Sequence, residues 1–260
     1  EPLNLILTPI KFFNSFPQGF SVLATNADRG IGFCAVADGT ASSVAKADWI
    51  QDSRDGAPMK IVRREILISV GEFSKSADCR RIQKDLEEGV SGVHWPPRSS
   101  SFIIYPESGK KRGQGNGVKP IKDGMMNLLK RRGWQLEKPL DLATVTRPGK
   151  LDAVLETSFG PFAVEWETGN ISSSHRALNK MALGLLKKKL VGGTLIVPSR
   201  ELYAYLTDRI GNISELEPYL DLWRIVPCGN GLLQIIVVEH DGTSKRVPRI
   251  GKCTDGRALA

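Results

Sequence analysis

The chain has 260 residues, with a hydrophobic fraction of 41% and a charged fraction of 25%. This composition excludes a disordered chain, and the length is typical of one large globular domain with or without a small appendage. The formal net charge of +8 favours a polyanionic partner, although a basic surface is by itself a weak indication. No apolar run is long enough to cross a bilayer, so we expect no membrane partner.

Cysteine and histidine usage predicts neither a disulfide framework nor a zinc site. The four cysteines are widely spaced without a CxxC pair, and there are only three histidines. The N-terminus lacks a basic segment followed by an apolar one, which argues against a signal peptide. These features together predict a cytoplasmic protein with reduced thiols at Cys34, Cys79, Cys228 and Cys253.

Residues 1–58 differ from the rest of the chain. They contain four basic and six acidic side chains and follow no sustained helical or strand period, whereas regular patterning begins at Met59. One interpretation is an N-terminal extension of uncertain structure. The other, which we favour, is that Met59 is the true start, because residues 59–260 suffice for a complete domain.

The first regular elements are helices separated by a loop. Ser76 to about Gly89 has a polar start and a glycine stop, which predicts a helix. Residues 106–119 are rich in Gly and Lys and predict a mobile loop. The segment Ile121–Arg132 carries its apolar side chains on one face and predicts a second helix.

Strands and helices alternate after residue 150. This alternation predicts an α/β fold, with a mixed central β-sheet flanked by helices. The predicted strands are Leu151–Thr157, Pro161–Glu167, Thr194–Val197 and Leu232–Glu239. The predicted helices are Ser172–Lys189, a helix capped by Ser199 and running through Arg209, and Glu215–Trp223.

An acidic cluster is predicted where the first two of these strands meet. Glu165 and Glu167 are two residues apart and therefore point to the same face of a strand. A turn at Ser158–Phe159 would set Asp152 opposite Glu165, and a turn shifted by one residue along both strands would set it opposite Glu167. An intermediate register would break the cluster, so the grouping depends on the turn.

Three carboxylates on one face repel one another unless cations neutralise them. Hard oxygen ligands suit Mg²⁺, and two such ions can stabilise the attacking and leaving oxygens of a phosphate. The pattern therefore indicates metal-assisted phosphodiester hydrolysis. The alternative without a function is that Glu165 and Glu167 face solvent from an edge strand. The nearby apolar residues and Asp152 disfavour this alternative.

A series of short motifs extends over about 155 residues of the chain. The segments are N-G-V-x-P-I-K (Asn116–Lys122), E-K-P-L-D (Glu137–Asp141), the isolated Asp152, E-x-E-T-G-N-I-S-S-x-H-R-x-x-N-K (Glu165–Lys180), Y-L-T-D-R (Tyr205–Arg209), E-L-E-P-Y (Glu215–Tyr219) and D-G-x-S-K-R (Asp241–Arg246). In this order and at this spacing the series resembles the BamHI family of type II restriction endonucleases, and the series is specific although no single motif is.

The resemblance implies a restriction-endonuclease-like core that depends on Mg²⁺. Asp152, Glu165 and Glu167 would be its catalytic and metal-binding carboxylates, with the carbonyl of Trp166 as a further ligand and Glu137 as a further acidic active-site residue. Two ions per site are expected, with Mn²⁺ as a substitute. Glu167 stands where the wider nuclease pattern has Lys, and would help to activate the attacking water.

The resemblance also implies residues that read double-stranded DNA. Their chemistry suits base edges, because Arg reads guanine, Asn reads adenine and Asp accepts from cytosine. Simpler alternatives remain open: Asp208 and Arg209 as a helix-end ion pair and Arg176 as a solvated residue. His175 is expected to be a packing residue or a neighbour of a phosphate rather than a base. The implied set is Asn170, Ser172, Arg176, Asp208, Arg209 and Lys122, with Asp241 near the minor groove.

The resemblance implies cleavage at a palindrome, GGATCC or a close relative, and a cognate DNA methyltransferase in the same system. A palindromic site calls for a homodimer whose symmetry matches it. The apolar face of Leu178–Leu190 could form the dimer interface or pack in the core. Two rivals are a DNA-binding protein that no longer cuts and a glycoside hydrolase, the latter disfavoured by an aromatic content of only 7%.

Overall fold

The computed structural model describes residues 58–111, 113–141, 149–207 and 210–251. The predicted N-terminal extension therefore lies outside the described residues except for Pro58, as do Asp208, Arg209, Cys34 and Cys253. The described cysteines, Cys79 and Cys228, are free thiols. None of the described helices has the length and apolarity needed to cross a membrane.

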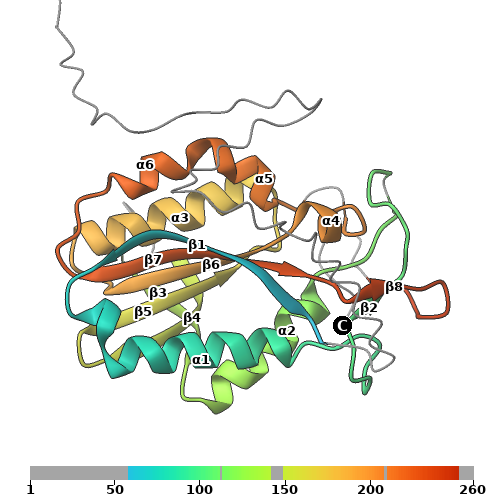
Figure 1. The fold of residues 1–260 in the computed structure, drawn as a ribbon, viewed down its shortest axis with the longest axis horizontal. Coiled ribbons are helices and arrows are strands. Elements are labelled where there is room, and N and C mark those ends of the chain that lie inside the picture. The colour runs from blue at the N-terminus through green and yellow to red at the C-terminus, as the bar shows by residue number, and fades with distance from the viewer. Residues whose placement is uncertain (1–57, 112, 142–148, 208–209, 252–260) are drawn as a thin grey trace, which may run out of the picture. The chain divides into compact units, whose positions relative to one another are not determined.

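Strands and helices alternate along most of the described chain (Figure 1). The strands are β1 (Lys60–Val70), β2 (Ile103–Ile104), β3 (Gln135–Leu140), β4 (Gly149–Thr157), β5 (Gly160–Trp166), β6 (Gly192–Pro198), β7 (Gly231–Glu239) and β8 (Gly242–Thr243). The helices are α1 (Ala77–Ser91), α2 (Lys119–Arg131), α3 (Ile171–Leu186), α4 (Arg200–Tyr203), α5 (Ile213–Leu216) and α6 (Leu220–Arg224), with 3-10 turns at Phe73–Lys75 and Glu217–Tyr219.

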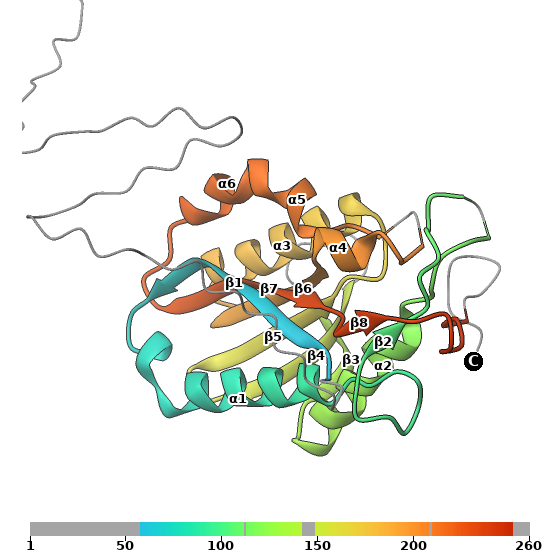
Figure 2. The ribbon, with the colours of Figure 1, turned by 45° about the vertical axis from the view of Figure 1, so that its right-hand side comes forward.

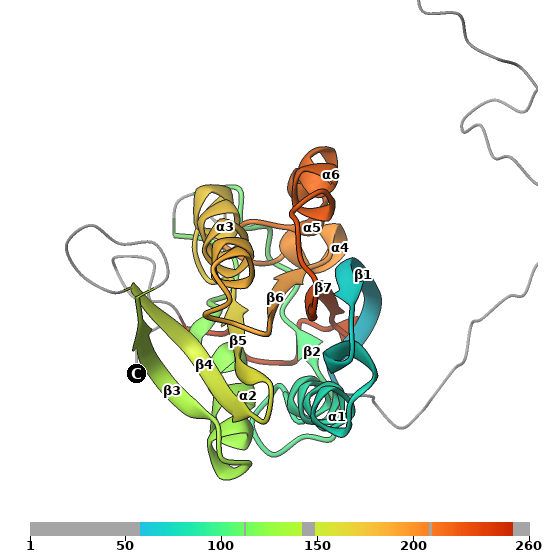
Figure 3. The same ribbon diagram turned by 90° about the vertical axis from the view of Figure 1, so that its left-hand side faces the viewer.

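The central sheet has six strands in the order β1-β7-β6-β5-β4-β3. Strands β5, β6 and β7 are parallel, and the remaining pairings in this sheet are antiparallel. Helices α1 and α2 cover one face, and α3, α5 and α6 cover the other (Figure 3). The predicted mixed sheet flanked by helices is therefore confirmed.

Each face of the sheet has its own hydrophobic core. Phe73, Leu86 and Phe162 belong to the core under α1 and α2, whereas Leu178 and Leu195 belong to the core under α3. Every residue of β6 is buried, as expected for a parallel strand that is covered on both sides. The apolar face of α3 packs into this second core, so the core-packing alternative holds for Leu178 and its neighbours.

The β4–β5 hairpin has the register that sets Asp152 opposite Glu165. Thr157 pairs with Gly160, which leaves a two-residue turn at Ser158–Phe159. Gly160 has a φ of 119°, a conformation that glycine adopts without strain. This turn is one of the two that we expected to keep the acidic residues on one face.

Several sequence-based expectations were wrong. The helix capped by Ser199 ends at Tyr203 rather than running through Arg209. The helix expected over Glu215–Trp223 is split into α5, a 3-10 turn and α6, because Pro218 has no backbone N–H to continue the α-helical ladder. Strands β1 and β3 at the two sheet edges were not predicted at all.

Candidate active site

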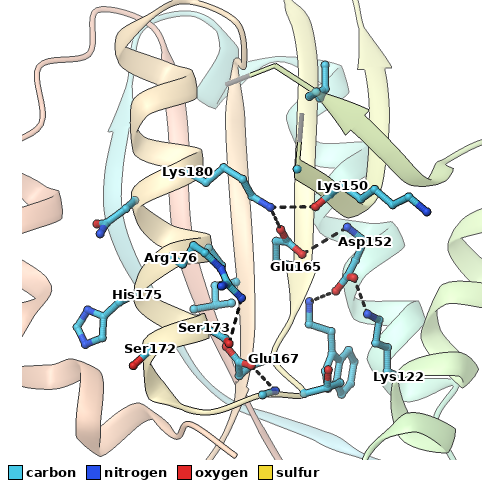
Figure 4. Close-up of a pocket in the computed structure, with 18 of the residues that line it drawn as sticks. Lys122, Lys150, Asp152, Glu165, Glu167, Ser172, Ser173, His175, Arg176 and Lys180 are labelled. Atoms are coloured by element: carbon cyan, nitrogen blue, oxygen red, sulfur yellow. Dashed lines mark hydrogen bonds and ion pairs between the residues drawn. The ribbon is translucent and has the colours of Figure 1, made fainter. Parts of the chain in front are cut away.

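A cleft of about 1020 Å³ opens between β4, β5 and α3 (Figure 4). It lies where β5 ends and the chain turns into α3, with Lys122 contributed by α2. Asp152, Glu165 and Glu167 all line it, so the hairpin brings the three predicted carboxylates to one cleft. Its other polar lining residues include Lys122, Lys150, Ser172, Ser173, His175, Arg176, Asn179 and Lys180.

Asp152 is held by one backbone group and one cation. Its Oδ2 accepts from the backbone N–H of Trp166 at 2.8 Å, and its Oδ1 accepts from Lys122 Nζ at 2.5 Å. Only 13% of the Asp152 side chain is exposed, so this ion pair is largely shielded from water. The carboxylate is thereby fixed at the junction of β4 and β5.

Glu165 lies beside Asp152 and pairs with a second cation. Its carboxylate forms an ion pair with Lys180, whose Nζ also donates to the carbonyl oxygen of Lys150 at 2.9 Å. Burial and the neighbouring charge of Asp152 raise the pKa of Glu165 to about 7, against the opposing effect of Lys180. This crowding of negative charge is the electrostatic condition under which a divalent cation stabilises a site.

Glu167 follows β5 and is tied to the start of α3. Its carboxylate accepts from the backbone N–H of Gly169 at 2.5 Å and from the hydroxyl of Ser174 at 2.7 Å. Burial raises the pKa of Glu167, although these hydrogen bonds oppose the shift. A shielded carboxylate with a raised pKa takes up a proton more readily than an exposed one.

The sequence model of the BamHI restriction endonuclease family matches residues 59–257. Type II restriction enzyme OkrAI of Oceanobacter kriegii is 46% identical over 201 residues, covering 77% of this chain and 100% of the relative. The chain belongs to the BamHI family of type II restriction endonucleases. Type II restriction enzyme BamHI of Bacillus amyloliquefaciens is 32% identical over 191 residues, covering 71% of this chain and 85% of that enzyme.

A likeness to a solved structure was also found. It is the complex of restriction endonuclease BglII with a DNA 16-mer, with a TM-score of 0.38 and 11% sequence identity. The match covers 50% of this chain and 64% of that chain.

Type II restriction endonucleases generally depend on divalent metal ions, and the donor chemistry of the cleft fits one. Asp152 and Glu165 offer adjacent carboxylates, the hard oxygen ligands that Mg²⁺ prefers. Within the described residues, no group of three His, Cys, Asp or Glu side chains lies close enough together to hold a metal ion. The Glu167 carboxylate instead bonds to Gly169 and Ser174, so Asp152 and Glu165 are the two carboxylates that lie next to each other in the cleft.

The other residues predicted from the BamHI family resemblance fall into four groups. Lys122, Trp166, Ser172 and Arg176 line the cleft. Asn170 is exposed and caps α3 by accepting from the N–H of Ser173 at 3.3 Å. Asp208 and Arg209 lie outside the described residues.

Glu137 and Asp241 do not line this cleft. Glu137 is exposed, has a left-handed φ of 51°, and lies between the residues that pair with Ala153 and Leu151, which places it beside Asp152 in the register of β3. Asp241 lies between β7 and β8, where it forms an ion pair with Lys60 at 2.6 Å.

Sequence reasoning missed Lys180 and Ser174 as members of the site. Lys180 follows Ser173 and Arg176 at helical spacing, so the three side chains share the face of α3 that borders the cleft. That spacing was a usable signal, because an amphipathic helix next to an acidic strand presents its polar face to the acids. His175 packs against Tyr219 and Trp223, with ring centroids 4.7 and 5.5 Å away, which supports its interpretation as a packing residue.

Proposed function

We propose that this protein hydrolyses phosphodiester bonds in double-stranded DNA at a short palindrome, GGATCC or a close relative, in a Mg²⁺-dependent reaction. The observation that carries the proposal is the gathering of Asp152, Glu165 and Glu167 in one cleft of a BamHI family member. Residues 59–260 form the nuclease domain in this proposal. Its setting is cytoplasmic, beside a cognate DNA methyltransferase.

Asp152 and Glu165 are the proposed Mg²⁺ ligands, with the Trp166 carbonyl as a third. Two ions per site are expected, and Mn²⁺ is expected to substitute for Mg²⁺. When bound, the metal supplies positive charge that stabilises the phosphate and the leaving oxygen. Glu167 accepts a proton from the water that attacks phosphorus in line, and the bond to the 3′ oxygen breaks. Glu137 is assigned an accessory acidic role next to Asp152.

Three of the proposed base readers line the same cleft. Ser172 and Arg176 project from the first turns of α3, and Lys122 lies across from them (Figure 4). Arg and Asn side chains provide the bidentate donor and acceptor patterns that distinguish guanine and adenine. Asn170, Asp208, Arg209 and Asp241 complete the proposed set.

A palindromic target calls for a homodimer, and one exposed apolar patch supports it. Leu222 and Ile225 in and just after α6 are 60% and 76% exposed, and Tyr219 before them is 44% exposed. Apolar side chains grouped on one outer helix are typical of an interface between protein copies. Helix α6, which carries Leu222, lies in the outer layer of helices over one face of the sheet (Figure 3).

Asp152→Ala and Glu167→Ala variants test the proposed active site. Each is expected to lower Mg²⁺-dependent cleavage of plasmid DNA by at least about a thousandfold while leaving site-specific binding measurable, because both residues serve chemistry rather than affinity. Glu156→Ala on the same strand β4 is the matched control, since Glu156 lies outside the cleft. Wild-type cleavage rates in either active-site variant would contradict the assignment.

The alternative is a sequence-specific DNA-binding protein that has lost catalysis. Sequencing the fragment ends after digestion of a long DNA separates the two, since only a nuclease yields ends at one motif. Intact DNA in the presence of Mg²⁺ and Mn²⁺, with specific binding retained, would favour the alternative.

A further inference from the structure

Both carboxylate oxygens of Glu167 are held by residues at the start of α3. Oε1 accepts from the backbone N–H of Gly169 at 2.5 Å, and Oε2 accepts from the Ser174 hydroxyl at 2.7 Å. The first bond is local, because Gly169 lies only two residues further along the chain. The second bond comes from α3 itself, where Ser174 is fully buried. The two bonds together fix the orientation of the carboxylate, and one bond alone would leave it free to turn.

The Ser174 hydroxyl lies directly against Gly211. A Cβ atom at Gly211 would lie 2.5 Å from Ser174 Oγ, which is closer than a methyl group and a hydroxyl oxygen can approach. The same Cβ atom would lie 3.1 Å from Cα of Ile171 in α3. The missing side chain of Gly211 therefore leaves the space in which the Ser174 hydroxyl points to Glu167.

Gly211 is itself fixed where the chain passes between α3 and α5. Its N–H donates to the carbonyl oxygen of Gly169 at 2.9 Å, and Gly169 is the residue whose own N–H bonds to Glu167. The next residue, Asn212, is fully buried and caps α5 in a capping box with Glu215. Helix α5 packs beside α3 on this face of the sheet (Figure 2). The packing of these two helices therefore sets the position of Gly211 against α3.

We propose that Ser174, kept in place by Gly211, is a positioning residue for the Glu167 carboxylate. The inference rests on the proposed role of Glu167 as the proton acceptor, and Ser174 acts only through the carboxylate that it orients. A misplacement of about 1 Å at a reacting group can cost about a hundredfold in rate, so the orientation of this acid matters. Ser174 stands at the position marked x in the segment E-x-E-T-G-N-I-S-S-x-H-R, so the resemblance to the BamHI family assigns it no role.

The direct test is Ser174→Ala, which removes the hydroxyl and adds no bulk. The measurements are the single-turnover rate of cleavage at the cognate site and the dissociation constant for the same DNA in a chelator. We expect the rate to fall about tenfold to a hundredfold and the dissociation constant to stay within about twofold, because the hydroxyl orients the acid and does not bind DNA. A merely structural role would not separate the two measurements in this way.

Ser199→Ala is the matched control for the loss of a buried bond between a serine and a carboxylate. The Ser199 hydroxyl donates to the buried Glu239 carboxylate, and neither residue lines the cleft. Ser199 also caps α4, so its replacement should lower the melting temperature. We expect its single-turnover rate to stay within about twofold of wild type at temperatures well below melting.

A glycine pair tests the same idea while keeping Ser174. Gly211→Ala places a methyl group against the Ser174 hydroxyl, whereas a Cβ atom at Gly229, in the loop before β7, meets nothing within 4 Å. Gly211→Ala is expected to lower the single-turnover rate at least about tenfold, and Gly229→Ala to keep it within about twofold. In the Ser174→Ala background the clashing oxygen is gone, so adding Gly211→Ala should cost less than about a further twofold.

The outcomes separate this inference from the proposed function. Wild-type cleavage by Glu167→Ala contradicts the proposed function, and the inference falls with it. Loss of cleavage in Glu167→Ala together with a wild-type rate in Ser174→Ala overturns the role of Ser174 alone. Rate losses that multiply in the double variant also overturn it, because Gly211 would then act independently of the hydroxyl. If Ser174→Ala does not fold, a wild-type rate in Gly211→Ala overturns the inference in its place.

Discussion

At the residue scale, each of two neighbouring acids in the cleft has its own lysine. Lys122 pairs with Asp152 from α2, and Lys180 pairs with Glu165 from α3. The pairs limit the repulsion between the two carboxylates, but they do not abolish it, since the pKa of Glu165 still rises to about 7. The two carboxylates therefore still repel each other, and the site carries electrostatic strain.

This charge strain predicts how stability depends on pH in the absence of divalent cations. The folded state holds the Glu165 proton up to about pH 7, whereas the unfolded chain releases it near the ordinary pKa of 4.5. The contribution to folding is thus complete below pH 4.5 and is lost as pH rises to about 7, by up to roughly 1.4 kcal/mol per pH unit. Melting curves in a chelator should show a steeper loss of stability with rising pH for the wild type than for Glu165→Gln, in which Glu167 alone of the two glutamates keeps a raised pKa.

Removing Lys180 should shift the pH dependence of catalysis. In Lys180→Met the cation that lowers the pKa of Glu165 is gone, so the pKa moves above about 7. We expect the acidic limb of the kcat/KM profile to move to higher pH, so that activity lost at neutral pH returns in alkaline buffer. Lys84→Met, on the exposed side of α1, is the control, and a profile that falls evenly at all pH values would contradict the prediction.

At the element scale, the first turn of α3 combines structural and proposed recognition roles. Asn170 caps the helix, and the Ser174 hydroxyl donates to the Glu167 carboxylate. Arg176 donates to the Ser173 hydroxyl at 3.3 Å. The start of a helix also presents free N–H groups that favour phosphate. The stability of α3 and the proposed DNA readout therefore depend on the same residues.

Substitutions at Asn170 can separate the two roles. Asn170→Asp keeps an oxygen that accepts from Ser173, so thermal stability should stay close to wild type, but the adenine-type donor is lost and specific binding should weaken at least about tenfold. Asn170→Ala should lose the same binding and also about 1 kcal/mol of stability. Specific binding by Asn170→Asp at wild-type affinity would argue against a base contact.

Elements with a strong local pattern could be predicted from sequence, and edge elements could not. Helices α1 and α3 have clear amphipathic periods, and the β4–β5 hairpin has a two-residue turn that fixes the neighbours of Asp152. Strand β1 lacks clean alternation, because register shifts near Val62 and Leu67 break its period. The cleft acids were found from spacing and resemblance, whereas the lysine partners depend on packing between distant helices.

At the scale of the whole molecule, the apolar patch on α6 and the proposed palindrome point to a pair of chains. The sheet faces and the apolar face of α3 are already used by the protein's own cores, and the proposed interface therefore uses the exposed side chains of Leu222 and Ile225. Two copies related by a two-fold axis would present two clefts to the two strands.

A double substitution, Leu222→Asp with Ile225→Asp, tests this arrangement. Charged side chains at the interface should shift the protein to monomers. Double-strand cleavage should then fall strongly, whereas the melting temperature should change little. Val62→Asp on β1 is a matched control, because Val62 is also apolar and 52% exposed but lies outside the patch. Light scattering gives the mass, and dimers persisting in the double variant at micromolar concentration would contradict the interface.

The bonds that tie Glu167 to Gly169 and Ser174 have a consequence for fidelity. Glu167, proposed to take up the proton, and the start of α3, proposed to contact the bases, are only a few residues apart in the chain. A wrong base pair that displaces the start of α3 would therefore also displace the Glu167 carboxylate from the water molecule that it is proposed to activate. Discrimination between DNA sites would then need no long-range coupling through the protein, because one movement would disturb both the base contact and the catalytic carboxylate.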